Sequence, residues 1–381
     1  MSDVITLLQD LVRIPSVNPA SALPAEPAGE GPLADLIQIW LEAEGLPVVR
    51  QTVSPGRDNL LSFAPGQGGP GLLLEAHLDT VGTSDMVGFP FSGELREGKV
   101  WGRGACDTKA SVAAMLIALR RAARENLPGG VMLALVVDEE YGFTGIERLV
   151  REPWPQPVAG AVVGEPTGLR VIDRHSGAVR MKFIAEGRAA HSAYPERGAN
   201  AIHHAVALIG AFERHHEELR ATAAEGSART CTVTLIEGGE AINIVPARCA
   251  VSVDRRLVPG EDPAEVRAEL EAVAQAAAGG RFPVQSEILL LDPPLNPRTP
   301  APLVELALRV TAQVTGASER TAVNYSTDAS NLAATGLEAI VLGPGDIAQT
   351  HGAEEWVAVE QVEQAAEVYY LLAAAAHEIQ Q

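Results

Sequence analysis

The stretch from residue 71 to residue 80, GLLLEAHLDT, is a short apolar run that ends in polar side chains. Two further runs have the same form, VMLALVVDEE at 131–140 and AGAVVGEPT at 159–167. Continuous apolar strands are typical of a sheet that is buried on both faces. The segment KASVAAMLIALRRAARE at 109–125 is rich in Ala and Leu and lacks Gly and Pro, which favours a helix between the first two strands. Strand, helix and strand in this order predict a parallel crossover, and therefore an α/β fold with a mostly parallel sheet flanked by helices.

The pattern changes from about residue 174, where apolar and polar positions begin to alternate. Alternation of this kind predicts antiparallel strands with one wet face, and it is found in VRMKFIAEG (179–187), TCTVTL (230–235) and RCAVSVD (248–254). Helical stretches at 199–220 and 263–278 separate these strands. We therefore expect a smaller α+β domain, with an antiparallel sheet and two helices, inserted at residues 174–288.

The remaining segments, 1–173 and 289–381, are predicted to form one larger domain. The proline-rich stretch LDPPLNPRTPAP at 291–302 would return the chain to it, because proline disfavours continuation of helix and strand alike. A helix at 302–315, a strand at 339–343 and a last helix from about residue 359 are expected to follow.

Charge and cysteine content exclude several classes of function. The chain has 29 Lys and Arg against 49 Asp and Glu, a formal charge of −20 that would repel nucleic-acid phosphates and anionic membranes. Its three cysteines are an odd number spread over 381 residues, which argues for a reducing compartment. Asp3 and Asp10 interrupt the apolar spacing of the first helical stretch, and no apolar run reaches the length of a membrane span. We expect a soluble cytoplasmic protein that binds neither nucleic acid nor membrane.

Metal-type side chains stand where the apolar strands end, and ligands of open α/β sheets bind at strand ends. His77 and Asp79 lie two residues apart, so one can bind a metal while the other supports it. Glu139 and Glu140 are adjacent, and regular β geometry would point them in opposite directions, so the strand must turn there. The other residues of this kind are Asp107, Glu165 and His351. With Asp79 and Glu139 left over, two histidines and three carboxylates form a mixed N/O ligand set suited to zinc, or less selectively to cobalt or manganese.

At this point the chain resembles the dinuclear zinc amidohydrolases and exopeptidases, a family that includes acetylornithine deacetylase, succinyl-diaminopimelate desuccinylase, carboxypeptidase G and aminoacylase. The resemblance covers essentially the whole chain. Its motifs here are HLDT (77–80), GRGACDTKA (102–110), DEEYGFTG (138–145), GEPTG (164–168), AAHSAYPERGANAI (189–202), NIVPAR (243–248) and GPG (343–345) followed by His351.

The resemblance implies two Zn²⁺ ions, with Co²⁺ or Mn²⁺ as possible substitutes. Asp107 would bridge both ions, His77 and Glu165 would complete one site, and Glu140 and His351 would complete the other. Asp79 would orient His77. Glu139 would hold the metal-bridging water, act as general base and hand the proton to the leaving amine.

Further residues follow from the resemblance in the inserted domain and the last third of the chain. His191 would donate to the oxyanion, often from the partner subunit, which implies a homodimer formed through the inserted domain. Arg256, or alternatively Arg255, would bind the substrate carboxylate. Asn243 and Gly345 are the other expected substrate contacts.

The substrate implied is a small N-acyl amino acid. Within the family, residues 321–332 and 341–356 look most like acetylornithine deacetylases, which implies hydrolysis of N-acetylornithine to ornithine and acetate. A succinyl-diaminopimelate desuccinylase, a carrier-linked lysine or ornithine hydrolase and a metallo-dipeptidase or carboxypeptidase are the alternatives. Asp328 could contact an amino side chain or be a solvated surface residue. The intact ligand positions weigh against a non-catalytic binding protein, and the lack of a GxSxG motif weighs against a serine hydrolase.

Overall fold

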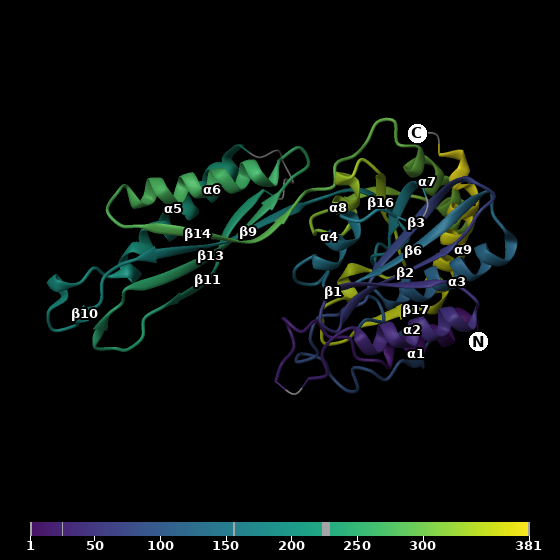
Figure 1. Ribbon diagram of the computed structural model, residues 1–381, viewed down its shortest axis with the longest axis horizontal. Coiled ribbons are helices and arrows are strands. Elements are labelled where there is room, and N and C mark those ends of the chain that lie inside the picture. The colour runs from purple at the N-terminus through teal and green to yellow at the C-terminus, as the bar shows by residue number, and fades with distance from the viewer. Residues whose placement is uncertain (1, 25, 155–156, 223–228, 380–381) are drawn as a thin grey trace. The chain divides into compact units, whose positions relative to one another are not determined.

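The computed structural model describes residues 2–24, 26–154, 157–222 and 229–379 (Figure 1). Its internal contacts divide the chain into two compact units. Unit 1 consists of Met1–Arg174, Pro297–Ala322 and Thr327–Gln381, and unit 2 consists of His175–Asn296 and Val323–Ser326. Within the four described ranges, none of the helices is both long and apolar enough to cross a membrane.

An eight-stranded sheet with the order β1-β2-β6-β3-β7-β16-β8-β15 forms the centre of unit 1. The four middle strands β6, β3, β7 and β16 are mutually parallel, whereas β1, β2 and β8 join by antiparallel pairing. All eight residues of β6 are buried, so the predicted burial of the sheet on both faces is confirmed. The strands are β1 (Val48–Ser54), β2 (Arg57–Ala64), β3 (Gly69–His77), β6 (Gly129–Val136), β7 (Val158–Val163), β8 (Val171–His175), β15 (Arg320–Val323) and β16 (Glu338–Val341).

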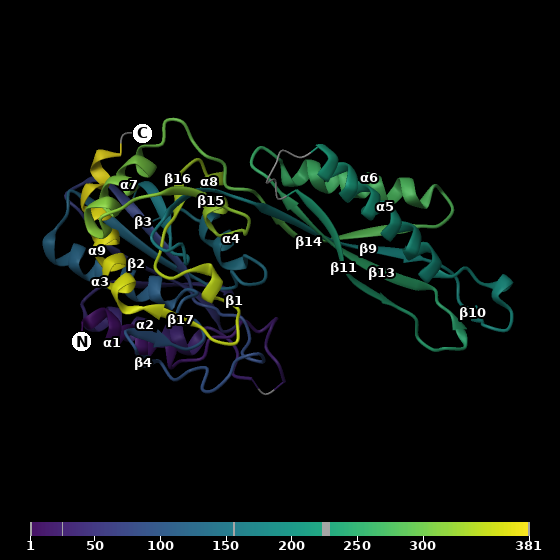
Figure 2. The ribbon, with the colours of Figure 1, turned by 180° about the vertical axis from the view of Figure 1, so that it is seen from behind.

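Helices cover this sheet, and the predicted α/β class is confirmed. Helices α3 and α9 pack against each other on one face, while α4 and α8 contact each other on the opposite face (Figures 1 and 2). The predicted helix at 109–125 is α3, and its small Ala side chains allow close packing against the sheet. The helices of unit 1 are α1 (Asp3–Val12), α2 (Gly31–Ala43), α3 (Lys109–Glu125), α4 (Thr144–Val150), α7 (Pro302–Thr315), α8 (Ala329–Ala334) and α9 (Val359–Ala375), with short 3₁₀ turns at Ile347–Gln349 and Ala376–Glu378.

A small three-stranded sheet with the order β17-β5-β4 adds to unit 1. Its strands are β4 (Glu94–Arg96), β5 (Lys99–Trp101) and β17 (Trp356–Ala358). Because β5 precedes the Asp107 segment and β17 follows His351, this pairing joins two segments that are more than 250 residues apart in the chain.

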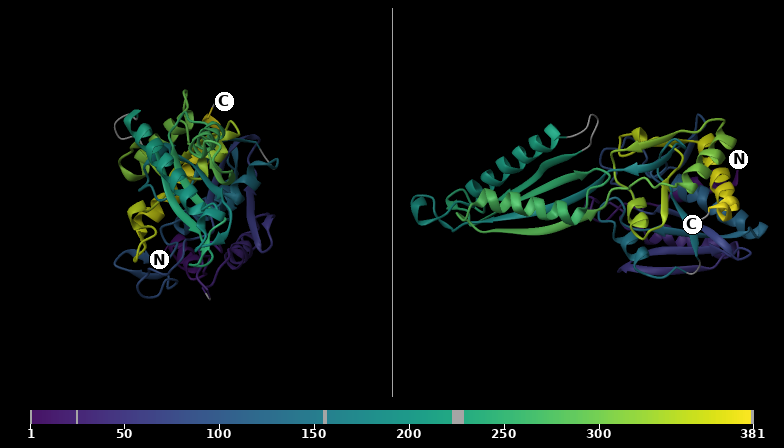
Figure 3. Two further views of the ribbon diagram at one scale, coloured as in Figure 1. Left: turned by 90° about the vertical axis from the view of Figure 1, so that its left-hand side faces the viewer. Right: turned by 90° about the horizontal axis from the view of Figure 1, so that it is seen from above.

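Unit 2 is an antiparallel sheet with two helices, as the alternating pattern predicts. The sheet order is β11-β13-β9-β14, and buried and half-buried residues alternate along most of β9. Helices α5 and α6 lie side by side over one face of the sheet (Figures 1 and 3). Its elements are β9 (Gly177–Glu186), β10 (Ala190–His191), a 3₁₀ turn (Pro195–Arg197), α5 (Ala201–Thr222), β11 (Thr230–Gly238), β12 (Ile244–Val245), β13 (Arg248–Leu257), α6 (Pro263–Ala278) and β14 (Val284–Asp292).

The limits of the units differ in detail from the expected insert at 174–288. Residue 288 falls inside β14, which keeps pairing with β9 as far as the Asp292–Ala178 pair. The strand therefore continues into the proline-rich stretch, and unit 2 extends to Asn296. The short segment Val323–Ser326 also belongs to unit 2, which sequence patterns did not suggest.

Candidate metal centre

The carboxyl ends of the middle strands of unit 1 share one edge of the sheet, because these strands are parallel. His77 is the last residue of β3, the Glu139–Glu140 pair follows β6, and Glu165 follows β7. Asp107 stands two residues before α3, and His351 lies in the loop after β16. The fold thus brings all five predicted metal ligands and Glu139 to this edge.

The carboxylate of Asp107 lies between two imidazoles. Its Oδ1 is 3.1 Å from Nε2 of His77, and its Oδ2 is 3.3 Å from Nε2 of His351. Each imidazole has a further carboxylate beside it: Oε1 of Glu165 is 3.6 Å from Nε2 of His77, and Oε1 of Glu140 is 3.2 Å from Nε2 of His351. One aspartate therefore faces two imidazoles, each with a further carboxylate beside it.

The donor atoms are close enough for metal ions to replace the contacts between them. Ligand atoms of His77, Asp107 and Glu140 all lie within 4.8 Å of one another, as do those of His77, Glu139 and Glu165. Glu139 thus belongs by distance to the His77 side of the cluster. Nitrogen and carboxylate donors in such groups fit zinc and similar divalent ions.

The charges of the buried side chains in this cluster also favour the binding of cations. Burial, followed by repulsion from neighbouring carboxylates, raises the pKa of Glu139 and Glu165 well above the usual value and raises the pKa of Glu140. Burial alone would lower the pKa of His77, but Glu165 and other carboxylates raise it well above its usual value. So many carboxylates are costly to bury together unless positive charge compensates them, and bound divalent ions would supply that charge.

His351 differs from His77 in its surroundings. Its side chain is 51% exposed and its backbone φ is +56°, an uncommon value for a residue with a side chain. Hydrogen bonds to Asp107 and Glu140 raise the pKa of its imidazole to about 10. In the protein alone this imidazole is a cation at neutral pH, so a metal ion would take the place of its proton.

A sharp turn after β6 presents both glutamates to the cluster. Asp138 has a φ of +68°, in the left-handed region that aspartate tolerates better than most residues. The Asp79 carboxylate then accepts hydrogen bonds from the backbone N–H groups of Glu139 and Glu140, each at 3.1 Å. The turn inferred from the adjacent glutamates is therefore present, and Asp79 holds it.

Asp79 approaches His77 through both its backbone carbonyl and its side-chain carboxylate. Nδ1 of His77 is 2.9 Å from the backbone carbonyl oxygen of Asp79, which can only accept a hydrogen bond. The Asp79 carboxylate lies farther away, at 3.6 Å from the same nitrogen. The Nδ1 proton is held by the backbone carbonyl, so Nε2 is the nitrogen that faces the cluster and that a metal ion would bind.

Sequence patterns missed a buried polar network behind Asp79. Asn18 donates from Nδ2 to Oδ2 of Asp79 at 2.7 Å and to Oδ1 of Asp138 at 2.9 Å. Arg57 also donates to Asp138, and it pairs with the buried Glu30. Asn18 lies outside the strand ends and the motifs that carry the resemblance, so neither signal could have found it.

Asp328 and Gly345 are buried parts of the same unit. Asp328 is 1% exposed and interacts with the buried Glu75, so it is not a solvated surface residue. Burial and then Glu165 raise the pKa of Glu75 to about 8. Gly345 has a φ of +90°, a Cβ there would collide with Sγ of Cys106, and its N–H donates to Oε1 of Gln361 at 2.7 Å. Glycine is thus required at this position by its backbone.

The other predicted site residues, His191, Asn243, Arg255 and Arg256, all belong to unit 2. His191 is exposed, and its Nδ1 accepts the N–H of Ala193 at 3.0 Å, which places the ring proton on Nε2. The backbone carbonyl of the exposed Asn243 accepts the N–H of Ser192.

The two arginines of β13 have different surroundings. Arg255 is fully buried and paired with Glu261 at 2.6 Å, whereas the side chain of Arg256 is 32% exposed and paired with Asp254 at 2.8 Å. Of these two side chains, only Arg256 is accessible to a ligand.

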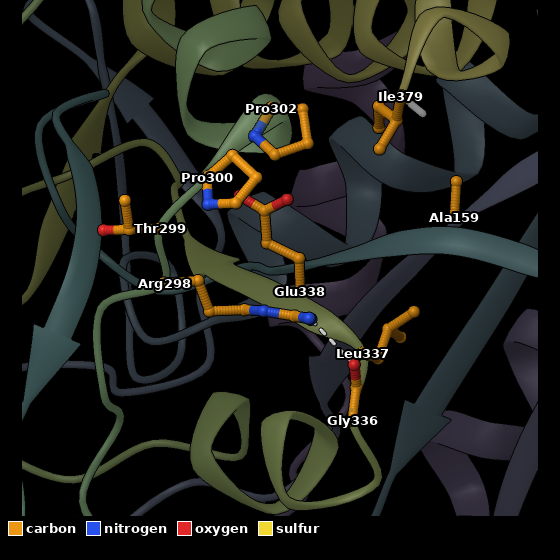
Figure 4. A pocket seen from close by; sticks show the side chains of 9 residues that line it. All are labelled: Ala159, Arg298, Thr299, Pro300, Pro302, Gly336, Leu337, Glu338 and Ile379. Atoms are coloured by element: carbon orange, nitrogen blue, oxygen red, sulfur yellow. Dashed lines mark hydrogen bonds between the residues drawn. The ribbon is translucent and has the colours of Figure 1, made fainter. Parts of the chain in front are cut away.

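A separate hollow of about 390 Å³ lies at the other end of the large sheet (Figure 4). Its lining includes the first residue of β16, Glu338, whose carboxylate accepts the N–H groups of Leu303 and Val304 at the start of α7. Arg298 beside it donates to the carbonyl of Gly336 at 2.7 Å. These polar groups serve to cap a helix and tie down a loop at the amino ends of the strands, and the hollow is not part of the metal centre.

Comparisons with known proteins relate the chain to one protein family. Residues 73–375 match the model of peptidase family M20/M25/M40. The chain is 34% identical to an acetylornithine deacetylase from Myxococcus xanthus, with 87% of the chain and 88% of that protein covered. It is 30% identical to a probable carboxypeptidase from Aspergillus niger, with 98% and 90% covered.

Two solved structures share the fold over nearly their whole lengths. An M20 family metallo-carboxypeptidase from Sulfolobus solfataricus has a TM-score of 0.80 at 17% identity, covering 99% of the chain and 100% of that protein. A dinuclear metal-binding peptidase of the M20 family from Bacillus subtilis has a TM-score of 0.71 at 14% identity, covering 99% and 98%.

Proposed function

Because the chain belongs to peptidase family M20/M25/M40, we propose that it is a two-metal amidohydrolase that cleaves the amide bond of an N-acyl amino acid. The first candidate substrate is N-acetylornithine, which would give ornithine and acetate. The observation that carries the proposal is the Asp107 carboxylate, whose two oxygens face the imidazoles of His77 and His351. A carboxylate in that position can bind one ion through each oxygen.

The donor set divides into two metal positions. Asp107 would bridge them, His77 and Glu165 would complete the first, and Glu140 and His351 would complete the second. Zinc fits the mixture of imidazole and carboxylate ligands, with cobalt or manganese as substitutes. When bound, two such ions lower the pKa of a shared water and polarise the scissile carbonyl.

Glu139 is the residue proposed to move the proton. It lies next to His77 and Glu165, so its carboxylate is within reach of the cluster, and the residue as a whole is half-buried. It would accept a proton from the attacking water and then donate it to the nitrogen of the leaving amine. A carboxylate that is not needed as a metal ligand is better suited to this exchange, which is why two adjacent glutamates are useful.

Unit 2 would supply groups that bind the substrate. The Nε2–H of His191 is free of the Ala193 contact and exposed, as a donor to the carbonyl oxygen of the transition state must be. Arg256, near the end of β13, would bind the substrate carboxylate. Asn243, which precedes the opposite end of β13, and Gly345 of unit 1 are the other proposed substrate contacts. We further propose a homodimer formed through unit 2, with His191 acting on the partner subunit's metal pair.

A carboxypeptidase is the second candidate. It is favoured by the Aspergillus relatives, one of which matches 98% of this chain, compared with 87% for the acetylornithine deacetylase. Both reactions hydrolyse an amide next to an amino acid carboxylate, so the same metal pair would serve either.

A substrate panel tests the proposal and separates the candidates. The zinc- or cobalt-loaded protein is incubated with N-acetylornithine, N-succinyl-diaminopimelate and N-blocked dipeptides, with and without a chelator. We expect acetate release that stops on chelation and returns when metal is restored. Faster release of a carboxyl-terminal amino acid from the blocked dipeptides would favour the carboxypeptidase. Activity that survives complete removal of metal would rule out the two-metal mechanism.

A further inference from the structure

A buried ion pair beside the metal centre joins the segments that carry its ligands. Glu355 is four residues after His351 and 1% exposed. Its Oε1 accepts the backbone N–H groups of Cys106 at 2.9 Å and Asp107 at 3.0 Å. Its Oε2 is paired with Nη1 of Arg103 at 2.7 Å. The glutamate therefore holds the backbone of the aspartate that lies between the two imidazoles.

Arg103 extends the contact to two other segments. It is 2% exposed, and its Nε donates to the carbonyl of Gly82 at 3.1 Å in the loop that follows Asp79. Its Nη2 donates to the carbonyl of Gly352 at 3.3 Å, next to His351. One planar guanidinium thus connects the segment after β3, its own Asp107 segment and the His351 loop.

The two sides of the metal centre depend on this pair to different degrees. His77 is buried at the end of β3, a strand bonded on both sides by β6 and β7. His351 is half exposed and lies in the irregular loop between β16 and β17. Near His351, the hydrogen bonds that hold this loop include the one from Arg103 to the carbonyl of Gly352 and those that the Glu355 carboxylate accepts. Without the pair, the second histidine would lose its fixed position before the first.

We propose that Arg103 and Glu355 are positioning residues that set the separation between His351 and Asp107, and so the affinity of the second metal position. This inference rests on the proposed metal pair, and it concerns residues that do not touch the ions. A buried ion pair adds little net stability to a fold compared with apolar packing, whereas the directions of its hydrogen bonds fix geometry. Residues that orient metal ligands from behind typically change metal affinity by about 10–100-fold when replaced.

The test uses Glu355→Gln in the full chain, titrated with Zn²⁺ and separately with Co²⁺ against a competing chelator. The amide can still accept the two backbone N–H groups through its oxygen, but it no longer pairs with Arg103 as a charged group. We expect one ion to bind as in the wild type and the second to bind about 10–100-fold more weakly. The Co²⁺ absorption spectrum should change only for the second ion. Arg103→Lys keeps the charge but lacks the guanidinium that contacts three segments at once, so it should give the same selective loss. It replaces the first variant in the test if Glu355→Gln does not fold.

Glu338→Gln is the matched control, because Glu338 is also a buried carboxylate that accepts two backbone N–H groups, at the opposite end of the sheet. It should lower the melting temperature of the metal-free protein and leave the affinities for the first and the second metal ion as they are in the wild type. Wild-type affinity for both ions in the Glu355 and Arg103 variants, or an equal loss at both positions, would overturn the inference. A wild-type protein that binds fewer than two ions would instead contradict the proposed function, so the two failures are distinguishable.

Discussion

Replacing Asn18 with alanine tests the network that holds Asp79 behind the metal centre. The Asn18 side chain is fully buried and donates to two carboxylates, those of Asp79 and Asp138. A hydrogen bond to a charged group contributes about 1.5–3 kcal/mol, so losing two of them should cost about 3–6 kcal/mol of unfolding free energy. Asp79 keeps two backbone N–H donors and Asp138 keeps Arg57, which favours the lower end of this range.

Asn59→Ala is a closely matched control. Asn59 is equally buried, and it also donates two hydrogen bonds, to Gln51 and to the carbonyl of Gly145, while its Oδ1 accepts one backbone N–H. Its acceptors are neutral, so the same substitution should cost only about 1–3 kcal/mol. Urea unfolding of the metal-free variants at neutral pH measures both values. An Asn18 variant that is no less stable than the Asn59 variant would refute the assignment of Asn18 as a donor to the side chains of two aspartates.

Three further predictions follow from the site and its surroundings. Glu139→Gln should leave the metal content unchanged and lower kcat by about 10²–10⁴-fold. Metal analysis and steady-state kinetics measure the two quantities. A variant with near-normal turnover would exclude Glu139 as the base. Hydrogen bonds raise the pKa of His351 to about 10, so an ion that binds at this histidine must displace its proton. The affinity for that second ion should therefore rise about tenfold per pH unit between pH 6.5 and 8.5 in zinc-buffered titrations. An affinity that does not change with pH would contradict this. Burial lowers the pKa of His175 to about 4, so the folded protein holds it neutral and loses up to about 3 kcal/mol of unfolding free energy as the pH falls from 6.5 to 4. Comparison of unfolding curves with those of His175→Gln, which should lack this loss, measures the effect.

The positions of the strand-end residues could be predicted because they depend on local patterns. An apolar run followed by polar residues identified β3, β6 and β7, and the parallel sheet then placed His77, Glu140 and Glu165 at one edge. The alternation in unit 2 likewise identified an antiparallel sheet with one wet face. In both units the pattern of apolar and polar residues along a strand is set by residues that are neighbours in the sequence, so the strand can be recognised without a structure.

The contacts that connect distant segments could not be predicted. Nothing local indicates that Glu355 accepts N–H groups 248 and 249 residues earlier in the chain, or that Asn18 donates to Asp138 across 120 residues. The β1–β2 hairpin and the antiparallel pairing of β8 were also not predicted, because the direction in which a strand pairs depends on residues far from it in the sequence. The expected end of the insert at residue 288 falls inside β14, whose apolar residues Leu289–Leu291 follow it and whose pairing with β9 continues to Asp292.

The most direct test is a crystal structure of the zinc-loaded protein with anomalous scattering recorded on both sides of the zinc absorption edge. We expect two zinc peaks, each bound by one oxygen of Asp107, with His77 on one ion and His351 on the other. A single peak, or two peaks of which only one contacts Asp107, would contradict the proposal of a bridged metal pair.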